Sequence, residues 1–242
     1  TSRSYPGRPM TPVTLHRTLL TAIKKHARII SFDIAHYVGT KHRVYNVPTP
    51  VMHDIAKNFA KEHKDIGADD CISLVNSLFH ASSFEEKVLA TMILRRFPII
   101  LASLPASYID QWLCLLTGWA EVDTFCDEID YWLRINPASG VKLLKKWNKD
   151  PYLEKRRASL VVLCSCLRHS PDPRWKTLAF TFTGALAHEK HVMITKAISW
   201  VLRAMVKYHK SEVTYYIQSH QNTLPKIAIR EATKKIQTGR KN

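Results

Sequence analysis

Apolar residues recur every three or four positions along most of this 242-residue chain, with polar residues between them. A clear example is the stripe Ile194, Ala197, Ile198, Val201 and Met205. A period near 3.6 residues predicts amphipathic helices, and the alternation typical of strands is confined to short ambiguous runs. The pattern therefore predicts an all-α protein of about eleven or twelve helices.

The expected helix starts carry recognisable capping residues. Ser83 and Glu86 have the spacing of a capping box before an apolar run. Elsewhere a capping residue precedes a proline, which suits the first helical position because its φ is fixed and its missing N–H is not needed there. These pairs are Thr11-Pro12, Thr49-Pro50, Asn136-Pro137, Asp150-Pro151 and Asp172-Pro173.

The connections between the expected helices are short, so neighbouring helices should form antiparallel hairpins. Successive hairpins of about 40 residues are typical of HEAT or armadillo repeats. We therefore expect residues 1–242 to form a single HEAT-like repeat domain, a helical-repeat solenoid with a concave basic face. Residues 1–10 are expected to be disordered or extended, and residues 11–47 to form an N-terminal helical cap. A globular all-α bundle is the alternative fold.

Positive charge is concentrated in the C-terminal part of the chain. From Val141 to Asn242 there are 21 Lys or Arg and 6 Asp or Glu, a balance of +15. From Thr1 to Gly140 the counts are 15 and 14, a balance of +1, and the two parts sum to the formal charge of +16. Such a field is typical of proteins that bind phosphate backbones. A basic surface that only aids solubility is the alternative.

Several classes of protein find no support in the sequence. The longest apolar run, Phe97 to Leu104, is too short to span a bilayer, and residues 1–10 lack the apolar core of a secretory signal. The five cysteines lack zinc or redox spacing, and His188 and His191 are three positions apart rather than the four of a zinc-peptidase helix. We therefore expect a monomer with no membrane span, no metal and no cofactor. We expect the protein to lie in the cytoplasm in association with the nucleoid, or in the nucleus if it is eukaryotic. We do not expect it to be secreted.

Trp200 lies off the centre of the apolar stripe of its helix. At about 100° per residue it aligns instead with Lys196, Arg203 and Lys207. A tryptophan within a row of cations is typical of nucleic-acid surfaces, where the cations hold phosphates and the indole packs against a sugar or base. Packing of Trp200 at the edge of the stripe is the structural alternative.

The segment 121–130 is acidic within a basic protein, and most of its five acids are expected on a solvated helix face. Asp123 differs, because Trp119 lies one turn before it on the same side of the helix. An indole shields one flank of the carboxylate and strengthens its field on a nearby cation. A metal site here would need histidines at fitting spacing, which the segment lacks.

Arg157 falls in line with Leu153, Leu160 and Cys164 on the apolar stripe of its helix. A cation at the edge of a core pairs with an acid or reaches for a phosphate. The sequence leaves both roles of Arg157 open.

Four strings, in this order and at compatible spacing, resemble the AlkD-type alkylpurine DNA glycosylases of the HEAT-like repeat DNA alkylation repair family. The strings are Gly118 to Asp123 with its tryptophan and aspartate, Lys155 to Ala158 with Arg157 at the active-site arginine, Lys196 to Arg203, and Arg230 to Ala232. The likeness runs over most of the chain and is strongest from Trp119 onwards.

The N-terminal part of the chain resembles the family less closely. Thr49-Pro50 opens a matching helix, and Tyr37 aligns with a tyrosine that helps to frame the lesion site. Pro48 departs from the pattern, because the best-known members have a DNA-contacting glutamine there.

The resemblance implies a DNA glycosylase that hydrolyses the N-glycosidic bond of cationic N3- or N7-alkylated purines in duplex DNA without full base flipping. Asp123 would stabilise the oxocarbenium-like sugar and orient the attacking water. Trp119 and Trp200 would pack against that sugar, and Arg157 would fix a neighbouring phosphate and Asp123 itself. The DNA-binding residues would be Tyr37, Thr49, Lys196, Arg203 and Lys207.

Two other functions remain open at this point. The first is a non-catalytic HEAT-repeat protein that binds bent or branched DNA, which would share the charge asymmetry. The second is a repeat scaffold for an acidic protein or RNA, which would give no reason for Asp123 to lie beside an indole.

Overall fold

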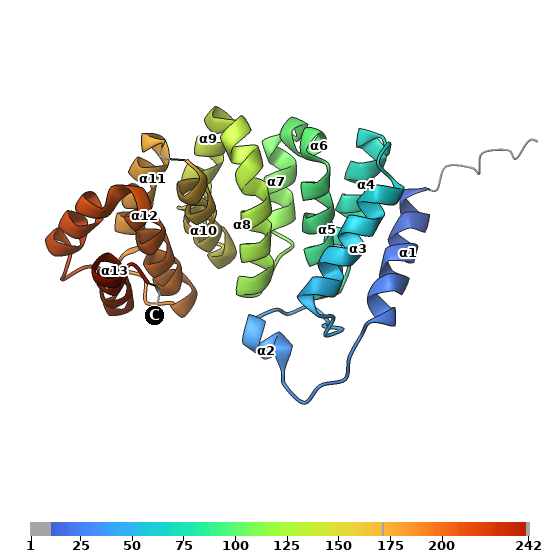
Figure 1. Cartoon of the computed structure of the whole chain (residues 1–242), viewed down its shortest axis with the longest axis horizontal. Coiled ribbons are helices and arrows are strands. Elements are labelled where there is room, and N and C mark those ends of the chain that lie inside the picture. The colour runs from blue at the N-terminus through green and yellow to red at the C-terminus, as the bar shows by residue number, and fades with distance from the viewer. Residues whose placement is uncertain (1–10, 171, 241–242) are drawn as a thin grey trace, which may run out of the picture. The chain divides into compact units, whose positions relative to one another are not determined.

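The structure, a computed structural model, describes residues 11–170 and 172–240, so the expectation for residues 1–10 lies outside the described part. The described residues form thirteen helices and no β-strand, apart from an isolated parallel bridge between Arg43 and Ser83 (Figure 1). The all-α prediction is confirmed. There are more helices than expected because short ones, such as α2 (Ile34–Val38) and α6 (Pro98–Ser103), contain too few residues to show a period.

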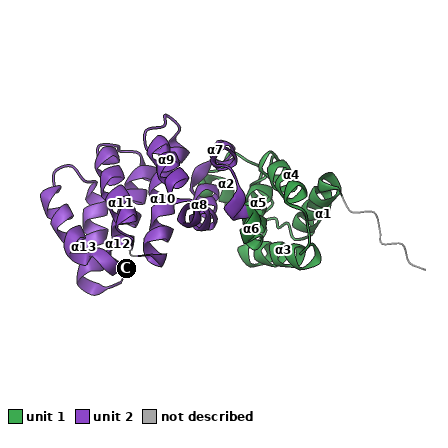
Figure 2. Cartoon of the chain, turned by 90° about the horizontal axis from the view of Figure 1, so that it is seen from above, with its two compact units in different colours: residues 1–100 green, residues 101–242 purple. Residues whose placement is uncertain are grey.

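The chain divides into two compact units, Thr1–Ile100 and Leu101–Asn242 (Figure 2). The expectation of one repeat domain over residues 1–242 therefore stays a prediction, and each unit is described by itself.

The first unit is built around α5. This helix packs against three others, and its residues from Glu85 to Leu94 are all buried. Even Glu85 faces inward, where its carboxylate accepts hydrogen bonds from the backbone N–H groups of Tyr45 (3.0 Å) and Val47 (3.3 Å) and so fixes the loop before α3. The helices of this unit are α1 (Pro12–Lys25), α2, α3 (Thr49–Glu62), α4 (Ala68–Phe79) and α5 (Phe84–Arg96).

The second unit is built around α10, which packs against α8, α9, α11 and α12. Four fully buried tryptophans fill its core: Trp112, Trp132, Trp147 and Trp175. The boundary between the units falls within α6, and the helices that follow are α7 (Ala106–Leu113), α8 (Gly118–Ile135), α9 (Pro137–Trp147), α10 (Leu153–His169), α11 (Pro173–Leu186), α12 (Val192–Ser219) and α13 (Lys226–Thr238).

Three of the predicted caps are confirmed by side-chain hydrogen bonds to the first helical turn. Thr11 accepts from the N–H of Thr14 at 3.3 Å, and Asp172 accepts from the N–H of Arg174 at 2.9 Å. Ser83 accepts from the N–H of Glu86 at 3.3 Å and donates its own hydroxyl to that carboxylate at 2.5 Å. Each of these bonds satisfies a donor that the helix itself leaves unpaired.

The other three predicted starts differ in detail. Asp150 accepts from the N–H of Tyr152 at 2.9 Å in a turn, and this delays the start of α10 to Leu153. Thr49 is already the first residue of α3, with Pro48 as the residue before it. Asn136 does precede α9, but its amide donates to the carbonyl of Ala102 at 2.9 Å instead of capping the helix.

None of the helices of the described residues has both the length and the apolar character needed to cross a membrane.

Candidate functional site

The entry into α8 fixes the position of two candidate residues. Gly118, the first residue of the helix, has a φ of +74°, a conformation that side-chain-bearing L-residues rarely adopt. The buried carboxylate of Glu121 accepts from the N–H of Thr117 at 2.8 Å and secures this turn. Trp119 therefore occupies the first turn of α8, and Asp123 follows one turn later.

Asp123 forms a two-pronged ion pair with Arg157 of α10. The Nε of Arg157 donates to Oδ1 at 2.9 Å, and its Nη2 donates to Oδ2 at 2.7 Å. The side chain of Arg157 is only 6% exposed and that of Asp123 is 14% exposed. Parallel hydrogen bonds between planar groups fix the carboxylate in orientation as well as in position.

A third bond of the same guanidinium reaches α12. The Nη1 of Arg157 donates to the backbone carbonyl of Met193 at 2.6 Å. Because α10 lies between α8 and α12 in this unit, one side chain ties the three helices together (Figure 1). A backbone acceptor such as the Met193 carbonyl leaves no signal in the sequence, so this contact could not be predicted.

Trp200 lies on α12, seven residues after Met193. Seven residues are nearly two helical turns, so Trp200 lies about 10 Å further along the axis on the same side of α12. Trp119 and Trp200 are both half-buried. The structure thus joins Asp123 and Arg157 directly and places the two indoles on the helices that flank α10.

Burial raises the pKa of Asp123 above its usual value, because water no longer stabilises the charged form. The hydrogen bonds and the charge of Arg157 oppose this effect, and the negative charge of Asp127 adds to it. Arg157 therefore supplies charge that offsets part of the desolvation of this carboxylate.

The three cations of the predicted row on α12 have different surroundings. Lys196 is exposed, whereas the Nε of Arg203 lies 3.5 Å from a carboxylate oxygen of Glu231 on α13. Lys207 donates to the carbonyl of Arg168 at 3.2 Å, at the end of α10. Equal angular spacing on the helix therefore does not give these three cations equal surroundings.

The expectation that most acids of segment 121–130 lie on a solvated face is wrong for two of them. Glu121 is buried by its contact with Thr117. Asp130 is fully buried and accepts from Arg134 at 3.3 Å, with a ring nitrogen of His169 at 3.0 Å. Periodicity alone could not show this, because buried acids with partners occupy the same positions as apolar residues.

Tyr37 and Thr49, the remaining DNA-binding candidates, belong to the first unit. Tyr37 lies on α2 with 59% of its surface exposed, and its ring centre is 5.5 Å from that of Phe32. Thr49 is exposed at the start of α3. Both side chains are thus positioned at the surface of their own unit.

Away from the Asp123–Arg157 pair, the described residues form hollows but no cluster of metal ligands. No group of three His, Cys, Asp or Glu that could hold a metal ion occurs within residues 11–170 and 172–240. Hollows on the second unit are lined by residues of α11, α12, α13 and the loops next to them, and neither Asp123 nor Arg157 is among these residues. The ion pair is therefore not at the bottom of any of these hollows.

Comparison with known proteins gives a family and a similar fold. The family model described as DNA alkylation repair enzyme matches residues 18–236. The fold is similar to that of a solved structure described as "Predicted DNA alkylation repair enzyme from Enterococcus faecalis", with 15% identity and a TM-score of 0.69 over 83% of this chain and 92% of that chain. At this identity the likeness concerns the fold alone.

A search of curated proteins gave no match. The family model, however, covers most of the chain, including the whole of α8, α10 and α12. The chain therefore belongs to the DNA alkylation repair enzyme family, which supports a role in the repair of alkylated DNA.

Proposed function

We propose that the protein is a DNA glycosylase that removes cationic N3- or N7-alkylated purines from duplex DNA. The observation that carries this proposal is the carboxylate of Asp123, fixed by two hydrogen bonds from Arg157 one turn after Trp119. A charge held in one orientation stabilises a developing cation without the cost of reorienting at the moment of reaction.

The substrate itself supplies part of the driving force. A purine alkylated at N3 or N7 is already cationic and leaves readily, so the protein needs no strong general acid at the base. As the glycosidic bond lengthens, positive charge develops on the deoxyribose. Asp123 stabilises that charge and orients the water that attacks the sugar carbon.

Arg157 acts on Asp123 rather than on a phosphate. Three of its N–H groups are already engaged, two by Asp123 and one by the carbonyl of Met193, and the side chain is almost fully buried. We therefore assign it as a positioning residue. The phosphate contacts of this unit fall to exposed cations such as Lys196.

The two indoles complete the proposed site. Trp119 and Trp200 pack against the deoxyribose, where their ring faces favour its cationic form. As the family resemblance implies, the lesion is then held while the base remains largely within the duplex. Tyr37, Thr49, Arg203 and Lys207 are further candidates for contacts with DNA.

Release of purines from methylated DNA tests the proposal. The protein is incubated with methylated duplex DNA, and the soluble fraction is analysed by chromatography for 7-methylguanine and 3-methyladenine. Asp123→Asn should lose at least about a hundredfold in excision rate, in the range measured for the loss of one electrostatic stabiliser. Its affinity for duplex DNA should stay within about threefold, since the phosphate contacts remain.

A matched variant separates catalysis from folding. Asp127 lies one turn after Asp123 on the same helix and forms an exposed pair with Arg168 at 3.2 Å. Asp127→Asn should excise at close to the wild-type rate. Excision by Asp123→Asn at the rate of this control would remove Asp123 from the mechanism.

One observation favours a second candidate, a non-catalytic protein that binds bent or branched DNA. Both oxygens of Asp123 are engaged by Arg157, an arrangement that also suits a purely structural ion pair. A protein of this kind would bind a four-way junction more tightly than a linear duplex and would release no purine from methylated DNA.

A further inference from the structure

The second half of α12 carries a surface of which only Lys207 is also a candidate contact of the proposed excision. The helix is kinked at His209, whose φ of −136° and ψ of 40° are not helical. A hollow crosses this kink, and its described lining residues all belong to α12. We call this surface the kink surface, made of Lys207, Tyr208, Lys210, Tyr215 and Gln218.

Two tyrosines of the kink surface are exposed. Tyr215 has 73% of its surface exposed and Tyr208 has 43%. Both line the same hollow, Tyr208 before the kink and Tyr215 after it. Because both exposed rings line one hollow, they offer apolar faces on which a flat group of a partner can pack.

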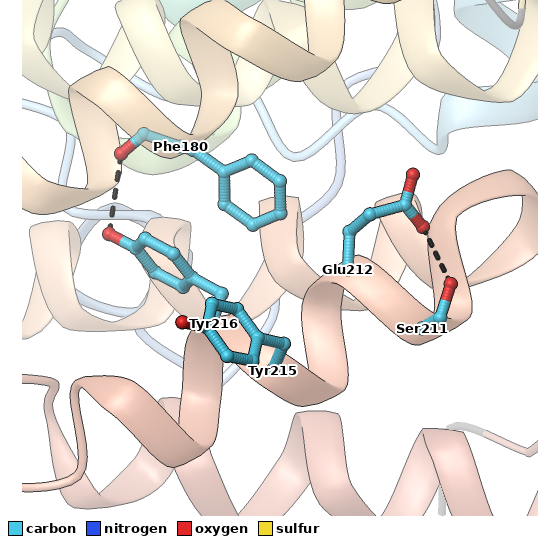
Figure 3. Close-up of a pocket in the computed structure, with 5 residues that line it drawn as sticks. All are labelled: Phe180, Ser211, Glu212, Tyr215 and Tyr216. Atoms are coloured by element: carbon cyan, nitrogen blue, oxygen red, sulfur yellow. Dashed lines mark hydrogen bonds between the residues drawn. The ribbon is translucent and has the colours of Figure 1, made fainter.

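A wall of two fixed aromatic rings adjoins Tyr215. Tyr215 also lines a second hollow, together with Phe180, Tyr216, Ser211 and Glu212 (Figure 3). Tyr216 donates its hydroxyl to the carbonyl of Phe180 at 3.3 Å, and the two ring centres are 4.5 Å apart. Tyr215 is therefore an exposed ring between two hollows, one of them walled by aromatic rings.

The charges of the two hollows differ. Glu212 lines the aromatic hollow, where Lys176 lies 3.1 Å from one of its carboxylate oxygens. The kink surface contains Lys207 and Lys210, both exposed, and none of its five residues is acidic. The nitrogen of Lys207 lies 4.5 Å from the ring centre of Tyr208, so the cation covers one face of that ring. Tyr215 is thus the ring best placed to receive a partner beside these lysines.

We propose that the kink surface binds an unpaired segment of a nucleic-acid strand, with one base stacked on Tyr215 and the adjoining phosphates on Lys207 and Lys210. Flat rings beside cations match the chemistry of such a strand, since every base offers a stacking face and every phosphate a charge. Bases within a duplex already stack on one another and offer no free face. The surface therefore fits a single strand better than a duplex, and an acidic peptide would use the lysines without the ring.

This binding site is separate from the proposed excision site. Tyr215 lies fifteen residues after Trp200, which is about 22 Å along α12. The inference goes beyond the proposed function and does not depend on it, because Tyr215 and Lys210 are not among the residues assigned to excision.

Fluorescence anisotropy with a labelled twelve-nucleotide oligothymidylate, which forms no hairpin, tests this proposal. Tyr215→Ala should weaken binding about tenfold, as expected when one base loses its aromatic partner, whereas Tyr215→Phe should stay within about twofold. Both variants should keep the wild-type circular dichroism spectrum, because the side chain is exposed. Excision from methylated duplex by Tyr215→Ala should equal that of the wild type, so a failure of one proposal can be told from a failure of the other.

The phosphate contact has its own measurement. Lys210→Ala should reduce the slope of log affinity against log salt by about 0.7, the value for one phosphate of a single strand. Lys64→Ala removes the same charge from an exposed position in the first unit and should leave the slope unchanged.

Three results would overturn the proposal. One is oligothymidylate affinity of Tyr215→Ala equal to that of the wild type. Another is a loss of duplex affinity in Tyr215→Ala that equals its loss of oligothymidylate affinity, measured with a duplex of the same length. The third is binding of polyglutamate that also depends on Tyr215, since the surface would then serve an acidic protein segment.

Discussion

The guanidinium of Arg157 and the carboxylate of Asp123 form a pair of parallel hydrogen bonds, 2.9 and 2.7 Å long, between α10 and α8. A further bond from Arg157 to the Met193 carbonyl adds α12 to the same contact. A buried pair of this kind is close to neutral for stability when complete and strongly destabilising when one partner is removed. The geometry of the candidate site and the stability of the second unit are therefore coupled through Arg157.

Arg157→Ala should lower the free energy of unfolding by about 3–5 kcal/mol, because it leaves Asp123 buried without a counter-charge. Urea denaturation followed by circular dichroism measures the change. Arg168→Ala is the matched control, since its pair with Asp127 is exposed and worth at most about 1 kcal/mol. Similar losses in the two variants would show that the Asp123–Arg157 pair is no more important than a surface ion pair.

Lys196 and Arg203 should respond differently, although they lie on the same row of α12. Lys196 is exposed, so Lys196→Ala should reduce the slope of log duplex affinity against log salt by about 0.9, the value for one lost phosphate contact. Arg203 lies 3.5 Å from Glu231 with a side chain 13% exposed, so Arg203→Ala should mainly lower the melting temperature. If the two variants reduced the salt slope equally, Lys196 and Arg203 would both bind phosphates, as the sequence predicts.

Much of the fold could be predicted from the sequence because local signals determine it. The stripe from Ile194 to Met205 is buried as the periodicity predicts, and the caps at Thr11 and Ser83 form as their spacing predicts. The start of α10 could not be placed, because the choice between Pro151 and Leu153 depends on a turn closed by Asp150. Propensity gives a helix its approximate place, and the hydrogen bonds of the flanking residues decide where it begins.

The candidate site was less accessible to sequence reasoning, because its contacts join distant segments. The position of Arg157 on an apolar stripe indicated a buried cation, and only the family resemblance named Asp123 as its partner. The choice of Asp123 over the other acids of α8 depends on how α8 packs against α10. The partner of Arg203 on α13 and the carbonyl partner of Arg157 on α12 have no sequence signal at all.

Replacing Trp200 should mainly reduce activity, whereas replacing Trp175 should mainly reduce stability. Trp175 is 1% exposed, so Trp175→Ala should cost about 3–5 kcal/mol of unfolding free energy through the cavity it leaves. Trp200 is half-buried, so Trp200→Ala should cost clearly less stability and yet reduce purine release at least about tenfold. Unfolding in urea and chromatography of released purines supply the two measurements. Full excision by Trp200→Ala would place this indole outside the site.

Asp110 should make part of the stability of the second unit depend on pH. Burial alone would raise the pKa of Asp110, but hydrogen bonds from Lys146, Lys155 and the indole of Trp147 outweigh it and lower the pKa from 3.8 to about 2. A carboxyl group whose pKa is lower in the folded than in the unfolded state stabilises the fold above the unfolded value. That contribution is lost as the pH falls from about 3.8 to about 2, because the unfolded state then binds the proton first.

The variant Asp110→Asn isolates this contribution. Near neutral pH it should unfold at a lower urea concentration than the wild type, because Asp110 on α7 can no longer pair as an anion with Lys146 on α9 and Lys155 on α10. The difference between the two midpoints should be constant from pH 7 to about 5 and should narrow below about 4, where the wild-type carboxyl begins to take up its proton in the unfolded state. If the difference between the midpoints persisted unchanged to pH 3, the charge of Asp110 would contribute nothing to stability. Only the hydrogen bonds of Asp110 would then matter.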